Sequence, residues 1–315
     1  MTELMAWLIA AAQALLLALL APVVMGVTKT VRARLEGRAS GRVGQPWRDL
    51  RKLLRKPPTS PTDSGIFFTA APPMLMATSL IVAATAPFIT TVGVAGSADL
   101  IVVVGVLLLG TVALTLAGLD TGTAFGGMGS SREMTIAALV EPTLLLSVFA
   151  LSARVGSTNL GAIVNAGNAD PEAVFTPASL LAFAALAIAT LAETARIPVD
   201  NPSTHLELTM VHEAMILEYS GRDLALIEWA SAMRLTILLG LLANLFAPWG
   251  IATTISLAWV VAGAGFFIVK VLGLAAVLAA GEVFVAKLRL FRVPELLAGS
   301  FALALLAVLA SYVLA

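Results

Sequence analysis

The sequence predicts an all-α, polytopic membrane protein: a bundle of about eight transmembrane helices plus one amphipathic helix at the membrane interface. Of its 315 residues 59% are hydrophobic, and the mean hydropathy is +0.97. Only 12% are charged, whereas a soluble domain carries about 25%. The chain has no cysteine, which excludes disulfides, iron–sulfur clusters and thiolate metal sites, and two histidines cannot form a His-rich metal site. We therefore expect neither a catalytic centre nor a cofactor in this chain.

Eight apolar segments are each long enough to cross a bilayer, which takes about 20 residues. They are predicted at about 4–27, 70–92, 99–119, 134–154, 177–196, 229–248, 253–280 and 295–315. The first is not a signal peptide, because it has an acid, Glu3, and no base ahead of an apolar run that extends to Val27. We interpret residues 1–315 as a single integral membrane domain.

Basic side chains are confined to one set of connecting segments. Ten of the nineteen Lys and Arg residues lie in 28–56. Since such residues mark cytoplasmic loops, the cytoplasmic segments are predicted to be 28–69, 120–133, 197–228 and 281–294. The opposite connections, 93–98, 155–176 and 249–252, contain no Lys or Arg. We therefore predict a multi-pass protein of the cytoplasmic (inner) cell membrane with both termini outside. The sequence shows no internal repeat, which argues against an inverted-repeat transporter.

The basic stretch ends in a predicted amphipathic helix, 47–56. Its apolar stripe consists of Trp47, Leu50, Leu53 and Leu54, and bases occupy the other face. Such a helix lies at the interface and is attracted to anionic lipid. Two interpretations stay open, an anchor that fixes topology or a platform for a partner protein. The candidate docking residues of this region are Arg42, Trp47, Arg48 and Arg51.

The segment 197–228 is rich in acids and contains both histidines. Its prolines break the chain, and either Asn201-Pro202 or a capping box from Thr204 to Glu207 is predicted to start a helix that Gly221 ends. The apolar residues between the acids favour packing against the bundle and another protein over a free loop. The histidines lack the zinc-site spacing, so hydrogen bonding or proton passing is expected. The docking candidates here are His205, His212, Tyr219 and Glu228.

Charged residues also occur within the predicted spans, where they are costly and usually functional. Glu141 precedes Pro142 and lies about 12 Å deeper than Glu133 at 1.5 Å per residue. Glu193 is expected to pair with Arg196.

Two bases within the spans bear on the charge of Glu141. Arg234 is expected to snorkel to the inner surface, and Lys270 lies deep in the seventh span. A structural interpretation pairs Glu141 with Lys270 or Arg234, whereas a functional one makes the acids a proton relay. The candidate path residues are Glu133, Glu141, Glu193, Asp200, Glu207, Glu213, Glu218 and Lys270.

Two short motifs resemble a known signature. The pattern Glu193-Thr194-x-Arg196-x-Pro198-x-Asp200, followed by Glu218-Tyr219-Ser220-Gly221, resembles that of the membrane subunit shared by respiratory complex I and group 4 membrane-bound nickel–iron hydrogenases. The string 197–230 is more similar to the formate hydrogenlyase subunit 4 or hydrogenase-4 type, because 201–205 reads NPSTH where complex I has an acidic P-E-A-E run. The loop 36–56 also lacks the G-P-N-x-x-G-P and L-Q-P elements of the quinone-reacting branch.

The resemblance implies a non-redox subunit of a modular oxidoreductase complex. Its expected partners are a hydrogenase-like large subunit and an iron–sulfur small subunit on the cytoplasmic side, antiporter-like membrane subunits and the lipid bilayer, with no nucleic acid. Iron–sulfur clusters and any nickel–iron centre would belong to the partners, and the carboxylates resemble the start of a proton path. The alternatives are a quinone-binding subunit of complex I type and a standalone ion transporter.

Overall fold

The computed structural model describes residues 2–61, 64–200, 210–254, 256–286, 288 and 292–313. Within these ranges the chain forms helices and no strands, which confirms the all-α prediction. The α-helices are α1 (Thr2–Leu35), α2 (Gln45–Leu54), α3 (Ile66–Thr85), α4 (Leu100–Asp120), α5 (Ala124–Val155), α6 (Leu160–Ala169), α7 (Pro177–Glu193), α8 (His212–Ile216), α9 (Gly221–Phe246), α10 (Leu257–Phe284) and α11 (Val293–Val313). Two 3₁₀ turns, η1 (Gly93–Gly96) and η2 (Pro171–Phe175), lie between them.

Each predicted span overlaps one helix, although α1 extends to Leu35, α3 ends at Thr85 and α5 begins at Ala124, ten residues before the predicted start. Seven helices, α1, α3, α4, α5, α9, α10 and α11, are long and apolar enough to cross a membrane. The helix at the predicted fifth span, α7, has 17 residues and is the shortest of the set. The protein is therefore a polytopic membrane protein, and the crossing of α7 stays a prediction.

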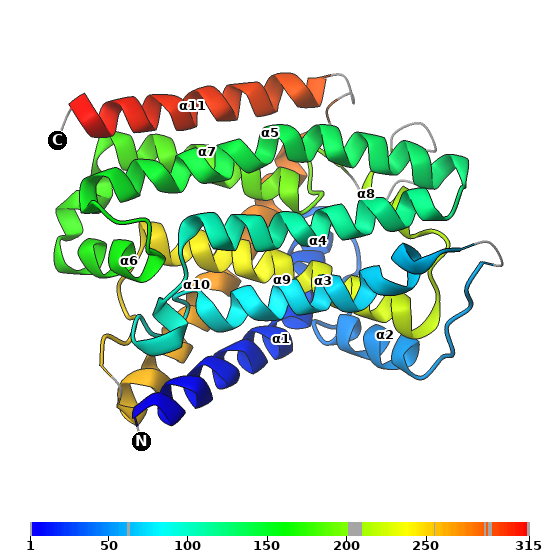
Figure 1. The fold of residues 1–315 in the computed structure, drawn as a ribbon, viewed down its shortest axis with the longest axis horizontal. Helices are drawn as coiled ribbons and strands as arrows, with labels where there is room; N and C mark the ends of the chain where they lie inside the picture. The colour runs from blue at the N-terminus through cyan, green and yellow to red at the C-terminus, as the bar shows by residue number, and fades with distance from the viewer. Residues whose placement is uncertain are drawn as a thin grey trace.

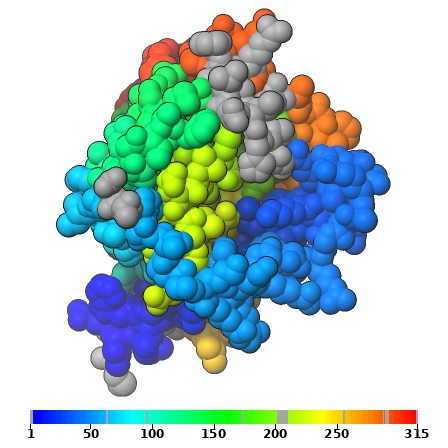
Figure 2. Space-filling model, turned by 90° about the vertical axis from the view of Figure 1, so that its right-hand side faces the viewer, coloured from blue at the N-terminus to red at the C-terminus, as the bar shows by residue number. Residues whose placement is uncertain are grey.

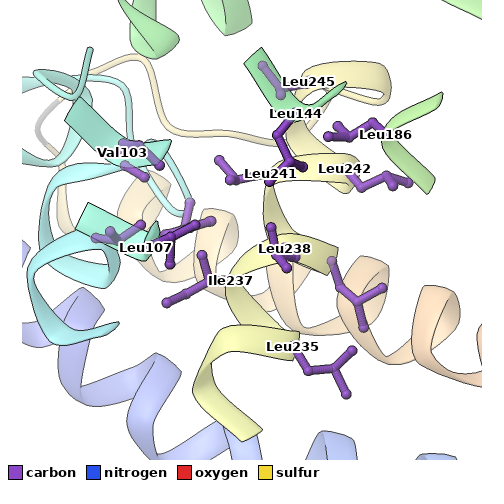
Figure 3. Close-up of a cluster of buried hydrophobic side chains, with 14 of the residues drawn as sticks. Val103, Leu107, Leu144, Leu186, Leu235, Ile237, Leu238, Leu241, Leu242 and Leu245 are labelled. Carbon is purple, nitrogen blue, oxygen red and sulfur yellow. The ribbon is translucent and has the colours of Figure 1, made fainter. Parts of the chain in front are cut away.

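Most of the long helices lie roughly parallel in one bundle, and α10 crosses behind them at a steep angle (Figure 1). At one end lie α2 and α8, and at the other lie α6 and both chain termini (Figure 1). The central helix is α9: 67% of its most apolar stretch is buried, against 22% for α10 and 28% for α11. Leucine and isoleucine side chains of α9 meet those of α4, α5 and α7 in the core (Figure 3). The bundle is thus built around α9.

A buried glutamine on α1 holds the end of α3. Gln13 is fully buried, and its amide nitrogen donates to the carbonyl oxygens of Ala83 and Ala86, each at 2.8 Å. Its amide oxygen accepts from the backbone N–H of Ile89 at 2.9 Å. Because α3 ends at Thr85 and a turn follows it, the last carbonyl groups of the helix depend on side chains for hydrogen bonds.

The amphipathic helix predicted over 47–56 is confirmed as α2, over Gln45–Leu54. Leu50 is buried, and the ring of Trp47 meets Trp229 of α9 edge-on with centroids 5.6 Å apart. The indole N–H of Trp229 donates to the carbonyl oxygen of Ala18 on α1 at 2.8 Å. The apolar stripe of α2 is therefore seated on α1 and α9.

The prediction that Gly221 ends a helix is wrong. The helix α8 stops at Ile216, and Gly221 is the first residue of α9, with a backbone φ of 54° that favours glycine. Close packing also requires glycine at this position, because a Cβ on residue 221 would lie 2.4 Å from the carbonyl oxygen of Pro57. The predicted helix starts at Asn201-Pro202 and Thr204–Glu207 lie outside the described residues.

We expect Gln13→Leu to destabilise the protein strongly, because it leaves the Ala83 carbonyl oxygen and the Ile89 N–H buried without a partner, while the Ala86 carbonyl oxygen keeps only the N–H of Phe88. Each such group costs about 1–3 kcal/mol, so the thermal unfolding midpoint of the purified protein should fall by several degrees. The control is Gln45→Leu on the exposed face of α2. Equal midpoints for the two variants would contradict the role assigned to Gln13.

Candidate functional site

One ion pair lies at the centre of the bundle. The guanidinium of Arg234 on α9 binds the carboxylate of Glu193 at the end of α7. Its Nη2 also donates to the Thr111 hydroxyl at 2.6 Å and to the Leu107 carbonyl oxygen at 2.9 Å, both on α4. The side chain of Glu193 is 3% exposed and that of Arg234 13%. Arg234 points into the bundle, so its predicted snorkelling and the predicted Glu193–Arg196 pair are both wrong.

Glu141 of α5 lies beside this pair. The residue is 7% exposed, and within the described part of the chain neither carboxyl oxygen has a hydrogen-bond partner. The charges of Glu193 and Arg234 are the ones that act on it. An isolated buried carboxylate is costly, so this environment favours the neutral acid. Of the two partners expected for Glu141, Arg234 is therefore the electrostatic neighbour.

Two more titratable groups, Glu133 and His212, lie near the same arginine, and Asp200 lies near both of them. The charges of Glu193, Arg234 and Asp200 act on Glu133, and those of Asp200 and Arg234 act on His212. Asp200 is 3% exposed. Burial lowers the pKa of His212 from its usual 6.5, with the charge of Asp200 opposing the shift, so the imidazole is neutral at pH 7. These residues, far apart in sequence, form one cluster with Glu141.

A second buried pairing involves a residue that the sequence analysis did not identify. Glu282 of α10 is 5% exposed, and its carboxylate lies 3.4 Å from Arg196 and 3.7 Å from Arg32. Arg196 thus binds α10 rather than Glu193. The available signal was that Glu282 is the one acid in the apolar run that becomes α10.

A cavity of about 250 Å³ opens between these groups. It is bounded by the inner part of α1, the 194–196 turn, α8, α9 and α10. Its titratable and basic lining residues are Lys29, Arg32, Arg38, Arg196, His212, Glu213, Glu228 and Glu282. A second cavity of about 200 Å³, between α1, α2 and α9, shares Met25, Lys29 and Glu228 with it. Figure 2 views this end of the molecule, where α2 and the start of α9 meet the ends of α1, α5 and α10.

The second signature motif holds the linker that follows α2. Tyr219 is buried, stacks on Phe68 with ring centroids 4.1 Å apart, and donates its hydroxyl to the Phe68 carbonyl oxygen at 2.8 Å. The hydroxyl of Ser220 accepts from the backbone N–H of Thr59 at 2.8 Å. With Gly221 against Pro57, the motif fixes the path from α2 to α3. The residues of this motif contact other parts of the same chain, and Tyr219, a predicted docking residue, is buried.

The other predicted site residues lie apart from the cluster. Glu218 is exposed beyond α8, as are Arg42, Arg48 and Arg51 around α2. Lys270 donates to the Asn244 side chain at 3.2 Å and to the Ala247 carbonyl oxygen at 2.6 Å, so its predicted pairing with Glu141 is wrong. His205 and Glu207 lie outside the described residues.

The family model described as NADH dehydrogenase matches residues 8–313. The chain belongs to this family. Hydrogenase-4 component C of Escherichia coli (strain K12) is 36% identical over 84% of this chain and 82% of its own length. Formate hydrogenlyase subunit 4 of the same strain is 32% identical over 94% and 95%.

A solved structure has the same fold. A chain of the membrane-bound sulfane sulfur reductase, an archaeal respiratory membrane complex, superposes with a TM-score of 0.83 at 18% identity, over 97% of this chain and 99% of that one. The resemblance predicted from the two motifs is confirmed at the level of the family, and the hydrogenase-type relatives match along most of the chain.

We expect Tyr219→Phe to loosen the start of α3 and the linker that leads to it from α2, because it removes the hydroxyl that binds the Phe68 carbonyl oxygen but keeps the stacked ring. A hydrogen bond contributes about 1 kcal/mol, so trypsin cleavage after Arg55 should become about fivefold faster. Tyr312→Phe is the matched control, since Tyr312 is 65% exposed on α11. Unchanged cleavage in the Tyr219 variant would show that the hydrogen bond does not hold the linker.

Proposed function

We propose that the protein is the membrane anchor and coupling subunit of a formate hydrogenlyase-like or related hydrogenase-type complex. It docks a cytoplasmic redox arm and links electron transfer in that arm to proton translocation. The observation that carries this proposal is the buried carboxyl group of Glu141, which has no hydrogen-bond partner among the described residues and lies beside the Glu193–Arg234 pair. A protein that needed this cluster only for stability would gain nothing from such an acid.

The proposed path starts at the cytoplasmic cavity. His212 and Glu213 line the cavity, Glu133 lies near the same arginine as His212, and Asp200 lies near both Glu133 and His212. From there a proton would pass Glu193 and reach Glu141 deeper in the bundle. Arg234 is paired with Glu193, and any weakening of that pair would change the field at Glu141. Electron transfer in the docked arm would drive this change through the cavity walls.

The cytoplasmic end supplies the proposed docking surface. Exposed bases of 28–56 surround α2, and the helix itself is seated by Trp47 and Leu50. The proposed arm consists of a hydrogenase-like large subunit and an iron–sulfur small subunit, and antiporter-like subunits would continue the path within the membrane. In this proposal, residues 1–315 form one membrane domain, α7 crosses the membrane and both termini lie outside.

A second candidate function is quinone binding of complex I type. The supporting observation is the pair of adjoining cavities, one of which opens between α1 and the interfacial helix α2. Such a position would admit an apolar molecule from the bilayer and bring a polar head group to the charged cavity. Organic extraction for quinone and metal analysis for nickel, both on the purified complex, separate the two candidates. Stoichiometric quinone favours the second, and nickel without quinone favours the first.

We expect Glu141→Gln to leave the complex assembled and to reduce its proton translocation at least tenfold, because the amide keeps the size but cannot titrate. Hydrogenase or dehydrogenase activity of the arm with an artificial electron acceptor should stay normal. Glu172→Gln, an exposed acid at the other end of the bundle, is the control. Wild-type proton translocation in the Glu141 variant would refute the relay, and failed assembly would show that Glu141 is a structural group.

We expect Arg51→Glu to weaken arm docking about fivefold, since reversing one exposed charge at an interface changes the free energy by about 1 kcal/mol. Recovery of the arm with the tagged membrane protein is the measurement, at low and high salt. Arg292→Glu, an exposed base ahead of α11, is the control. Equal arm recovery for both variants at low salt would remove α2 from the docking surface.

A further inference from the structure

Three cavities follow one another along the central helix α9. Ser231 and Leu235 line the cytoplasmic cavity of about 250 Å³. Leu238, Leu241 and Leu245 line a small cavity of about 20 Å³. Leu245 also lines a third cavity of about 200 Å³, at the end of the bundle that holds α6, which we call the outer cavity. From Ser231 to Leu245 the helix rises about 21 Å at 1.5 Å per residue, which is most of a hydrocarbon core about 30 Å thick.

The central ion pair lies directly against the small cavity. Arg234 donates to the carbonyl oxygen of Leu107, and the side chain of Leu107 lines this cavity. On α5, Glu141 comes one turn before Leu144, which lines it too. The cluster of Glu141, Glu193 and Arg234 therefore stands between the cytoplasmic cavity and the small cavity.

The small cavity is apolar on every side that the structure describes. Its eleven lining residues come from α4, α5, α6, α7 and α9, and each is a buried leucine or valine. Figure 3 labels several of them, among them Leu107, Leu144, Leu238 and Leu241. The space has room for roughly one water molecule, but a buried water needs roughly two to four hydrogen-bond partners. A space without such partners stays dry, as in channels that close by dewetting.

The outer cavity, by contrast, has polar walls. Arg154, Asp170 and Ser179 line it together with apolar residues such as Leu151. Glu141 and Arg154 lie on the same helix, 13 residues or about 20 Å apart. The hydroxyls between them donate to carbonyl oxygens of α5 itself at 2.7 to 2.9 Å and so form no bridge across this distance; they belong to Thr143, Ser147 and Ser152.

We propose that the leucine-lined cavity is a proton seal between the central acids and the outer cavity. A proton needs water or a titratable group to move, and an uncompensated charge in an apolar interior is very costly. The seal keeps Glu141 open to the cytoplasmic side only, so a proton that it carries does not leave through the outer end of this chain. Release to the outside then belongs to another membrane subunit of the complex. The inference rests on the proposed proton path and gives it a direction.

A leak measurement on the intact complex tests the seal. In proteoliposomes without redox substrates, Leu241→Asn should make an imposed pH gradient decay at least fivefold faster than in wild type, because the amide gives water a partner in the seal. Leu75→Asn is the matched control: Leu75 of α3 is 5% exposed against 8% for Leu241 and lines none of the three cavities. Leu241→Asn combined with Glu141→Gln should restore the slow decay. A tight Leu241→Asn complex, an equal leak in Leu75→Asn, or a leak that persists in the double variant would each overturn the seal.

Cysteine accessibility tests the same arrangement without a polar substitution in the core. The chain has no cysteine, so an introduced thiol is the only one in this subunit. Ser231→Cys in the cytoplasmic cavity and Ala166→Cys in the outer cavity should react with a charged methanethiosulfonate from opposite sides of the membrane. Val148→Cys in the seal should react from neither side. A reactive Val148→Cys, an unreactive Ala166→Cys, or labelling of positions 231 and 166 from the same side contradicts the inference.

The outcome for the seal is separable from the outcome for the proposed function. Loss of proton translocation in Glu141→Gln together with a tight Leu241→Asn complex would overturn the seal and leave the relay standing. Wild-type translocation in Glu141→Gln would refute the relay, whereas the leak in Leu241→Asn and the cysteine pattern would still show whether the barrier exists.

Discussion

The ion pair between Glu193 and Arg234 is the interaction on which the rest of the structure depends. It joins α7 to α9, and through Thr111 and the Leu107 carbonyl oxygen it also joins α4. A membrane bundle can bury such charges only when each is paired or hydrogen-bonded, because unsatisfied polar groups in hydrocarbon cost several kcal/mol. The pair therefore makes it possible for Glu141 to lie beside it as the one buried carboxyl group, among the described residues, whose two oxygens both lack a hydrogen-bond partner.

The signature residues have two different tasks in this structure. Arg196 binds Glu282 and so ties the turn after α7 to α10, whereas Tyr219 and Ser220 hold the linker between α2 and α3. Both tasks are architectural, and the first fixes a wall of the cavity between α1, α8, α9 and α10. A partner that presses on α2 or on the α8 region would therefore act on the same cavity from which the proposed proton path starts. Such a contact would link the proposed redox arm to the proposed proton path, and the link would need no redox group in this chain.

Much of the fold could be predicted from the sequence. Helix-length apolar runs give the eight segments, and the spacing of Trp47, Leu50 and Leu53 gives α2. The pairings could not be predicted, since Arg234 and Glu193 are 41 residues apart and Arg196 and Glu282 are 86 apart. Sequence neighbours such as Glu193 and Arg196 looked like partners, but the chain leaves its helix after Glu193 and turns Arg196 towards α10. Glu282 was missed because the predicted span ended at 280, although α10 continues to Phe284.

The central claim is that Glu141 carries a proton that moves when the complex works. Infrared difference spectroscopy of the purified complex, between its resting and reduced states, tests this claim most directly. The account predicts a band from a protonated carboxyl group that shifts in D₂O and is lost in the Glu141→Gln protein. The same band, unchanged in that variant, would contradict the account.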